Sequence, residues 1–233
     1  MNIEQAKSVI VDTHFAALNL NDRANAIEML SGPGVGKSDA VMQSVAELAA
    51  RLREPVGIVT FMLATISSVD VRGFMLPVKG AAGVMDTVFS TPPWYPTKAT
   101  MRVCEPDGVT WHREGSWDGP LPRAGVVFLD EFAAADDEVK KPAAELLYKG
   151  RVGTCELPSG WRVVAASNRM SDRSGVLRAM AFITNRRMQL NVSPSFPCWQ
   201  TWANAQPPGR RPHYSTLSFA QKNPNLVFRD AVP

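Results

Sequence analysis

The segment SGPGVGKS at Ser31–Ser38 has the composition and spacing of a phosphate-binding loop. Its glycines allow the backbone to turn so that successive N–H groups face phosphate oxygens, and Lys37 would place its charge on the β- and γ-phosphates. Ser38 would offer its hydroxyl to Mg²⁺. Ser31 stands where the GxxxxGKS/T pattern has its first glycine. The loop predicts that ATP and Mg²⁺ bind through Gly32, Pro33, Gly34, Val35, Gly36, Lys37 and Ser38.

A second candidate for chemistry is GVVFLDEF at Gly125–Phe132, an apolar run that ends in two acids. Asp130 would hold the magnesium, and Glu131 would polarise the attacking water, because hydrolysis of the γ-phosphate needs a base beside its nucleophile. Alternatively, the acids belong to a strand followed by a helix cap, where Asp is common. The phosphate loop upstream favours the catalytic interpretation.

Two further polar residues lie next to predicted apolar strands, one after its strand and one before. Asn168 closes WRVVAASN, and a polar amide at the carboxyl end of a sheet strand lies beside the ligand crevice of α/β folds. It would orient water between Glu131 and the phosphate, or it is simply a turn-forming residue. Arg186 in TNRRMQLNV would stabilise the charge that spreads over the transferred phosphoryl group, or it is an ordinary surface residue.

The elements that must position these residues are visible as short apolar runs and helical spacings. A helix is predicted over Val41–Leu52, and another over Lys141–Lys149 with Pro142 in its first turn. Strands that alternate with helices predict a doubly wound α/β sheet. The predicted strands are Ala26–Leu30, Gly57–Leu63, Gly125–Leu129, Trp161–Ala166 and Met188–Val192.

Two regions interrupt this alternation. Residues 65–123 are irregular and rich in Pro, Gly and Trp, and they are too long for a plain connection, so we expect an elaborated insertion there. From Ser193 onward the prolines predict a linker, followed by a short helical tail around Tyr214–Val227.

Composition limits the class of protein. The chain has 233 residues, 45% of them apolar and 20% charged, which suits one large domain or a core with a small lid. A net charge of +3 without basic blocks does not indicate a nucleic-acid partner. Three cysteines without CxxC spacing argue against a zinc site or a disulfide framework. With neither a signal layout nor a long apolar run, we expect a cytoplasmic protein without a membrane partner.

Taken together, the motifs resemble those of the AAA+ ATPases, and within them the MoxR branch, over Ala26–Phe228. The resemblance is carried by SGPGVGKS, FLDEF, LLYKGRVGTCELPSGWRVVAASNR and TNRRMQLNV. VDVRGFMLP at Val69–Pro77 resembles the D-(L/V)-x-G element of that branch's helix-2 insert. SDRSG at Ser171–Gly175 and WQTWA at Trp199–Ala203 are also similar to MoxR positions.

The resemblance implies a fold and a division of the chain. The expected fold is an α/β P-loop NTPase (AAA+) three-layer sandwich with a five-stranded parallel sheet, a long insertion and a short or truncated C-terminal lid. Residues 1–192 would form the nucleotide-binding core, with the insertion at about 65–123. Residues 193–233 would form the linker and a partial helical lid, because nothing there matches the lid's usual sensor 2 arginine.

It also implies roles for the motif residues. Arg186 would be the arginine finger, which in this family reaches the neighbouring subunit's site; the adjacent Arg187 is the alternative, and Arg186 is favoured. Gly153–Trp161 resembles the hairpin before sensor 1, with its turn at Pro158–Gly160. The remaining roles are Walker A for Lys37 and Ser38, Walker B for Asp130 and Glu131, and sensor 1 for Asn168.

Three functions stay open on the sequence. The first is a MoxR-type motor, a homo-oligomeric ring of six subunits that hydrolyses ATP and remodels a protein client, such as a protein with a von Willebrand A domain. The second is a nucleic-acid-directed ATPase, a helicase or a restriction-type motor, with Lys149 and Arg151 at the hairpin base. The third is a nucleotide-binding assembly module with little hydrolysis, which Ser31 and the unmatched sensor 2 would suit.

Overall fold

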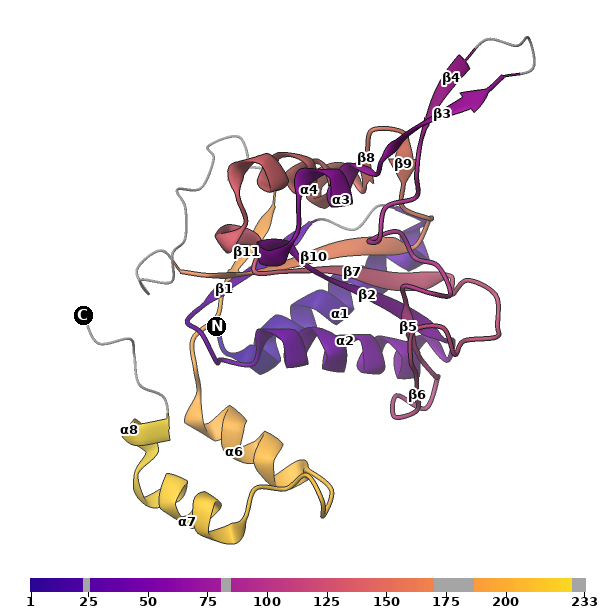
Figure 1. The fold of residues 1–233 in the computed structure, drawn as a ribbon. Helices are drawn as coiled ribbons and strands as arrows, with labels where there is room; N and C mark the ends of the chain where they lie inside the picture. Colours follow the sequence, from indigo (N-terminus) through magenta and orange to yellow (C-terminus); the bar gives the residue numbers. More distant parts are fainter. Residues whose placement is uncertain (23–25, 81–84, 170–186, 228–233) are drawn as a thin grey trace.

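A seven-stranded sheet runs through the centre of the protein. The computed structural model of the chain describes residues 1–22, 26–80, 85–169 and 187–227 (Figure 1). The strand order is β11-β1-β10-β7-β2-β5-β6. The first five strands in this order are mutually parallel, and they match the predicted runs to within two residues. These strands are β1 (Ile27–Ser31), β2 (Val56–Met62), β7 (Ala124–Asp130), β10 (Trp161–Asn168) and β11 (Met188–Asn191).

The prediction of a five-stranded sheet is therefore right for the parallel part and wrong for the total. Two strands of the insertion, β5 (Arg102–Cys104) and β6 (Trp111–His112), extend the sheet beyond β2. β5 runs antiparallel to β2, and β6 runs antiparallel to β5. Because both are two or three residues long, no alternation of apolar and polar residues marks them in the sequence.

Helices cover both faces of the sheet, which confirms the three-layer α/β sandwich (Figure 1). One apolar core lies between the sheet and the helices α1 (Ile3–Leu20) and α2 (Lys37–Leu52). The other lies under α3 (Ser68–Arg72) and α4 (Asp137–Lys149). No helix within the described ranges is long and apolar enough to cross a membrane.

Helix α1 is an element that the sequence analysis did not identify. Its start is a capping box, in which the Asn2 side chain accepts from the Gln5 N–H and the Gln5 side chain accepts from the Asn2 N–H. Its buried positions include Ala6, Ile10 and His14, spaced four residues apart. The polar His14 lies within this stripe and weakens the apolar pattern.

Helix α4 begins earlier than predicted. It starts at Asp137 with Asp136 as its N-cap, so Pro142 lies inside the helix and not in its first turn. Asp137 and Glu138 lie in its first turn, where the positive end of the helix dipole favours negative charge. Pro142 removes one backbone hydrogen bond, but its neighbours Ala143 and Leu146 are buried and hold the helix against the sheet.

The hairpin before β10 also differs from the prediction. β8 (Arg151–Val152) pairs with β9 (Cys155–Glu156), so the hairpin turns at residues 153–154 and not at Pro158–Gly160. Pro158–Gly160 instead forms the turn that leads into β10. Gly160 has a φ of 82°, and a Cβ there would lie 2.1 Å from the Arg123 carbonyl oxygen, so this second turn requires glycine.

The insertion contains a short helix and two hairpins. The 3-10 turn η1 (Leu63–Thr65) and α3 are followed by a hairpin of β3 (Met75–Lys79) and β4 (Met85–Phe89), which projects away from the sandwich (Figure 1). Every residue of both strands is exposed. The base of the insertion is held by Trp94, which is fully buried and whose Nε1 donates to the Val71 carbonyl oxygen at 2.7 Å.

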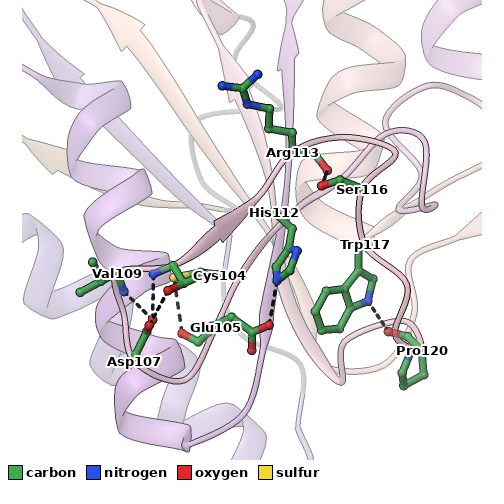
Figure 2. Close-up of polar contacts among 10 residues, drawn as sticks. Cys104, Glu105, Asp107, Val109, His112, Arg113, Ser116, Trp117 and Pro120 are labelled. Carbon is green, nitrogen blue, oxygen red and sulfur yellow. Dashed lines mark hydrogen bonds and ion pairs between the residues drawn. The ribbon is translucent and has the colours of Figure 1, made fainter.

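The β5–β6 hairpin carries its own polar cluster (Figure 2). His112 Nε2 lies 2.8 Å from Glu105 Oε1, and the Trp117 ring meets the His112 ring edge-on with centroids 5.0 Å apart. The Asp107 carboxylate accepts backbone N–H bonds from Val109 and Thr110, each at 2.8 Å. This cluster lies at β5 and β6, four and five positions from β1 in the sheet order, so it stabilises the extension and is not part of the phosphate-loop site.

The region predicted as a proline-rich linker contains a helix, so that prediction is wrong. α6 (Phe196–Ala205) has Pro197 in its first turn, where a missing N–H costs no helical hydrogen bond. Pro197 thus marks a helix start and not a break. The predicted tail is present as α7 (Tyr214–Lys222) and α8 (Pro224–Val227).

A buried pair of basic residues joins α1 to β10. His14 is 2% exposed, and its Nε2 donates to the Gly160 carbonyl oxygen at 2.9 Å. Arg162 is 3% exposed, and its Nη1 donates to the Ile10 carbonyl oxygen and to Thr13 Oγ1, each at 2.9 Å. Burial, together with the nearby Arg162 charge, lowers the pKa of His14 to about 3.

This pKa makes stability depend on pH. In the unfolded chain His14 becomes protonated below about pH 6.5, whereas in the folded protein its imidazole stays neutral down to about pH 3. The free energy of unfolding therefore falls as the pH falls through this window. Between pH 7.5 and 5.5 the loss of stability from this group is about 1.4 kcal/mol. Urea unfolding at pH 7.5 and 5.5 measures it, and His14→Gln should remove it. The exposed His213→Gln is the control; identical pH dependence in wild type and His14→Gln would contradict the assignment.

Candidate phosphate-binding site

The phosphate loop joins the end of β1 to the start of α2. Gly34 and Gly36 have φ angles of 72° and 93°, a left-handed conformation that glycine adopts without steric cost. Lys37 is the first residue of α2. The loop therefore turns directly onto the N-terminus of α2, where unpaired backbone N–H groups and the helix dipole favour an anion.

Among the described residues, three acceptors lie around the Lys37 ammonium. Its Nζ lies 3.0 Å from Ser31 Oγ, 3.0 Å from the Gly32 carbonyl oxygen and 2.8 Å from Asn168 Oδ1. The last contact depends on the sheet, because Ser31 and Asn168 are register partners at the ends of the parallel strands β1 and β10. The structure thus brings together two residues that are 131 positions apart in the sequence.

A hydroxyl and a carboxylate meet beside the loop. Ser38 Oγ donates to Asp130 Oδ2 at 2.7 Å, and Asp130 Oδ1 accepts from the Glu131 backbone N–H at 2.9 Å. Asp130 ends β7, the neighbour of β10 in the sheet. Oxygen ligands of this kind, one neutral and one anionic, fit the preference of Mg²⁺ for hard donors.

Glu131 adopts an unusual backbone conformation. Its φ is 55°, which is uncommon for a residue other than glycine and characteristic of strained functional positions. It is followed by the 3-10 turn η2 (Phe132–Ala134), in which Phe132 is 3% exposed and packs into the core. The buried Phe132 holds the turn, while Glu131 itself is exposed at the carboxyl edge of the sheet.

These side chains line one hollow of about 380 Å³. This volume lies within the range of small-molecule sites. Among the described residues, every site residue that the sequence predicted contributes to it except Gly32. The lining residues are Pro33, Gly34, Val35, Gly36, Lys37, Ser38, Asp39, Asp130, Glu131 and Asn168.

An adjoining hollow of about 210 Å³ was not predicted. It lies between the loop, the start of α1 and α6, and its apolar walls include Ile3, Val35, Trp199 and Trp202. Gly34, Val35 and Gly36 line both hollows. The sequence signal for this hollow is the WQTWA segment, which contains both tryptophans; the resemblance to MoxR positions gives this segment no role.

Arg186, like Ser171–Gly175, lies outside the described residues. Its neighbour Arg187 is described: Nη1 lies 2.6 Å from Glu28 Oε2, and the two side chains are 5% and 2% exposed. Ser167 also donates to the Glu28 carboxylate. Burial raises the pKa of Glu28, while Arg187 and Ser167 oppose that rise. Arg187 is therefore engaged within its own sheet, which argues against it as a finger for a neighbouring subunit.

Comparisons with known proteins give only structural likenesses. No protein-family model matches the chain, and a search of curated proteins finds no match. A candidate ATPase from Cytophaga hutchinsonii superposes with a TM-score of 0.43 at 14% identity, over 98% of this chain and 52% of that one. The RuvB Holliday junction branch migration motor of Thermotoga maritima gives 0.44 at 13%, over 87% and 48%.

A third likeness is to NtrX from Brucella abortus in complex with ADP, with a TM-score of 0.43 at 16% identity. It covers 86% of this chain and 38% of that one. The chain thus spans about half the length of the first two solved structures and less of the third.

Proposed function

We propose that this chain is a P-loop ATPase of the AAA+ class that binds Mg·ATP and hydrolyses it. The observation that carries the proposal is the meeting of Lys37, Asn168, Ser38 and Asp130 at the carboxyl edge of three neighbouring parallel strands. Open α/β sheets bind ligands at that edge. A glycine-rich turn onto a helix N-terminus at the same place suits a phosphate group.

The described residues support a division of roles in hydrolysis. Lys37 and the N-terminus of α2 would bind the phosphates, and Ser38 with Asp130 would hold Mg²⁺. The ion, when bound, neutralises charge that develops between the β- and γ-phosphates. Glu131 would accept the proton of the attacking water, and Asn168 would orient that water. These roles need Glu131 and Asn168 at the ends of adjacent strands, and β7 and β10 are paired neighbours in the sheet.

The second hollow supports a place for the nucleotide base. Trp199 and Trp202 offer flat apolar surfaces, and Ile3 and Val35 add aliphatic contacts. Because this hollow shares Gly34–Gly36 with the phosphate site, one ligand with an anionic tail and an aromatic base could fill both. Residues 193–233 would then act as the partial lid over the core formed by residues 1–192.

We further propose the finer assignment that the motifs suggest, a MoxR-type motor. In it a ring of six copies remodels a protein client, such as a von Willebrand A domain protein, and Arg186 completes the neighbouring site. No described contact favours a nucleic-acid partner. Of the two basic residues at the hairpin base, Lys149 pairs with a carboxylate: its Nζ lies 3.3 Å from Glu145 Oε1. This ion pair weakens the attraction of Lys149 for a polyanion.

Nucleotide binding by Lys37→Ala tests the core of the proposal. Hydrogen bonds to charged groups contribute about 1.5–3 kcal/mol, so removing the Lys37 ammonium should weaken Mg·ATP binding about ten- to a hundredfold. Isothermal titration calorimetry measures the affinity, and circular dichroism checks the fold. Lys141→Ala, which removes an exposed lysine on α4, is the matched control. Equal affinities of Lys37→Ala and wild type would contradict the phosphate site.

A further inference from the structure

Ser31 is a departure from the common phosphate-loop pattern, and its side chain contacts the lysine of the site. The residue is fully buried, at 0% exposure. Its hydroxyl donates to the Gly32 carbonyl oxygen at 2.8 Å and accepts from Lys37 Nζ at 3.0 Å. A glycine at this position would offer neither contact. Serine therefore adds one acceptor for the lysine that the usual loop does not have.

This added acceptor competes for a limited number of donors. A lysine ammonium has three N–H groups, and Ser31 Oγ, Gly32 O and Asn168 Oδ1 provide three acceptors within 3.0 Å. A phosphate oxygen that binds Lys37 has to replace at least one of them. The Gly32 carbonyl is available in any loop of this shape, whereas the Ser31 hydroxyl is supplied by this sequence.

We propose that Ser31 sets the nucleotide affinity of the site by holding Lys37 against the incoming phosphates. The inference rests on the proposed function and adds an affinity-setting residue to it. The Ser31 hydroxyl is shielded from solvent, so its bond to the ammonium is not readily exchanged for water. Asn168, from the neighbouring strand, holds the same ammonium from a second side. Nucleotide binding must release the lysine from these acceptors, which weakens binding and favours release.

Ser31→Ala removes the hydroxyl and little else. Ser31 ends β1 and is not among the described residues with positive φ, so alanine can adopt its backbone conformation without strain. The Cβ is already present and buried. The matched control is Ser44→Ala in α2, a serine with 1% exposure whose hydroxyl donates to the Ala40 carbonyl oxygen at 2.8 Å.

The experiment measures the affinities for Mg·ADP and Mg·ATP by isothermal titration calorimetry. A hydrogen bond contributes about 0.5–1.5 kcal/mol net, so Ser31→Ala should bind both nucleotides about two- to tenfold more tightly than wild type. Asn168→Ala should also bind ADP more tightly, because it too releases Lys37. Ser44→Ala should stay within about twofold of wild type. In steady-state kinetics, Ser31→Ala should lower KM by a larger factor than it changes kcat.

Two outcomes would overturn the inference. One is unchanged or weaker ADP binding by Ser31→Ala while Ser44→Ala binds normally. The other is an equal gain in both serine variants, which would indicate a general loosening of the loop and α2. Failure of the proposed function looks different, because then wild type, Ser31→Ala and Lys37→Ala would all fail to bind nucleotide.

Discussion

Glu131→Gln is expected to lower ATP turnover by about a hundredfold or more while Mg·ATP still binds. The amide keeps the size of the side chain but cannot take a proton from water. Asp130, which would hold the magnesium, is unchanged, and the backbone bond from the residue 131 N–H to Asp130 Oδ1 does not involve the side chain. Phosphate release under saturating ATP gives kcat, and calorimetry gives the affinity.

Glu138→Gln removes an exposed carboxylate from the first turn of α4 and should leave turnover within about twofold. If wild type hydrolyses no more ATP than Glu131→Gln, the catalytic role is wrong. The chain would then be a nucleotide-binding assembly module.

Arg187→Met is expected to lower the free energy of unfolding by about 3–5 kcal/mol. The substitution leaves the Glu28 carboxylate buried between β1, β10 and β11 without its cation, and Glu28 is 1% exposed. Urea unfolding measures the loss. The double variant Glu28→Gln/Arg187→Met should recover part of it, because no unpaired charge remains.

The neighbouring arginine gives the contrast. As a finger supplied to another subunit, Arg186→Met should lower turnover by about three to five orders of magnitude. If the proposed ring forms, mixing Arg186→Met with wild-type subunits should restore turnover at the sites that receive the arginine of a wild-type subunit. If Arg187→Met is as stable as wild type, the buried pair does not support the sheet, and Arg187 becomes a candidate finger again.

Much of the fold followed from local patterns. Four of the five parallel strands, β1, β2, β7 and β10, are mostly buried on both faces, and such runs are distinctive because helices must cover both sides of a parallel sheet. The convergence of the phosphate loop with Asp130 and Asn168 was also predictable, since the carboxyl ends of parallel strands share one edge. What the sequence could not supply was which oxygen meets which nitrogen, as in the bond between Lys37 and Asn168.

The remaining features depend on contacts between distant segments. The ion pair joins Glu28 of β1 to Arg187, the residue before β11, and neither residue carries a local signal of its partner. The hollow lined by Trp199 exists only because α6 returns to the loop. α4 starts earlier than predicted because Asp136, Asp137 and Glu138, and not Pro142, mark its N-terminus.

The parallel pairing of β1 with β10 has a consequence for how the protein acquires its site. Lys37 meets Asn168 across 131 positions, and Ser38 meets Asp130 across 92. Contacts of such sequence separation form late, because the chain must first lose the entropy of closing long loops. Nucleotide binding therefore depends on contacts between distant segments of the chain, and a ligand that selects the finished sheet stabilises the whole fold by mass action.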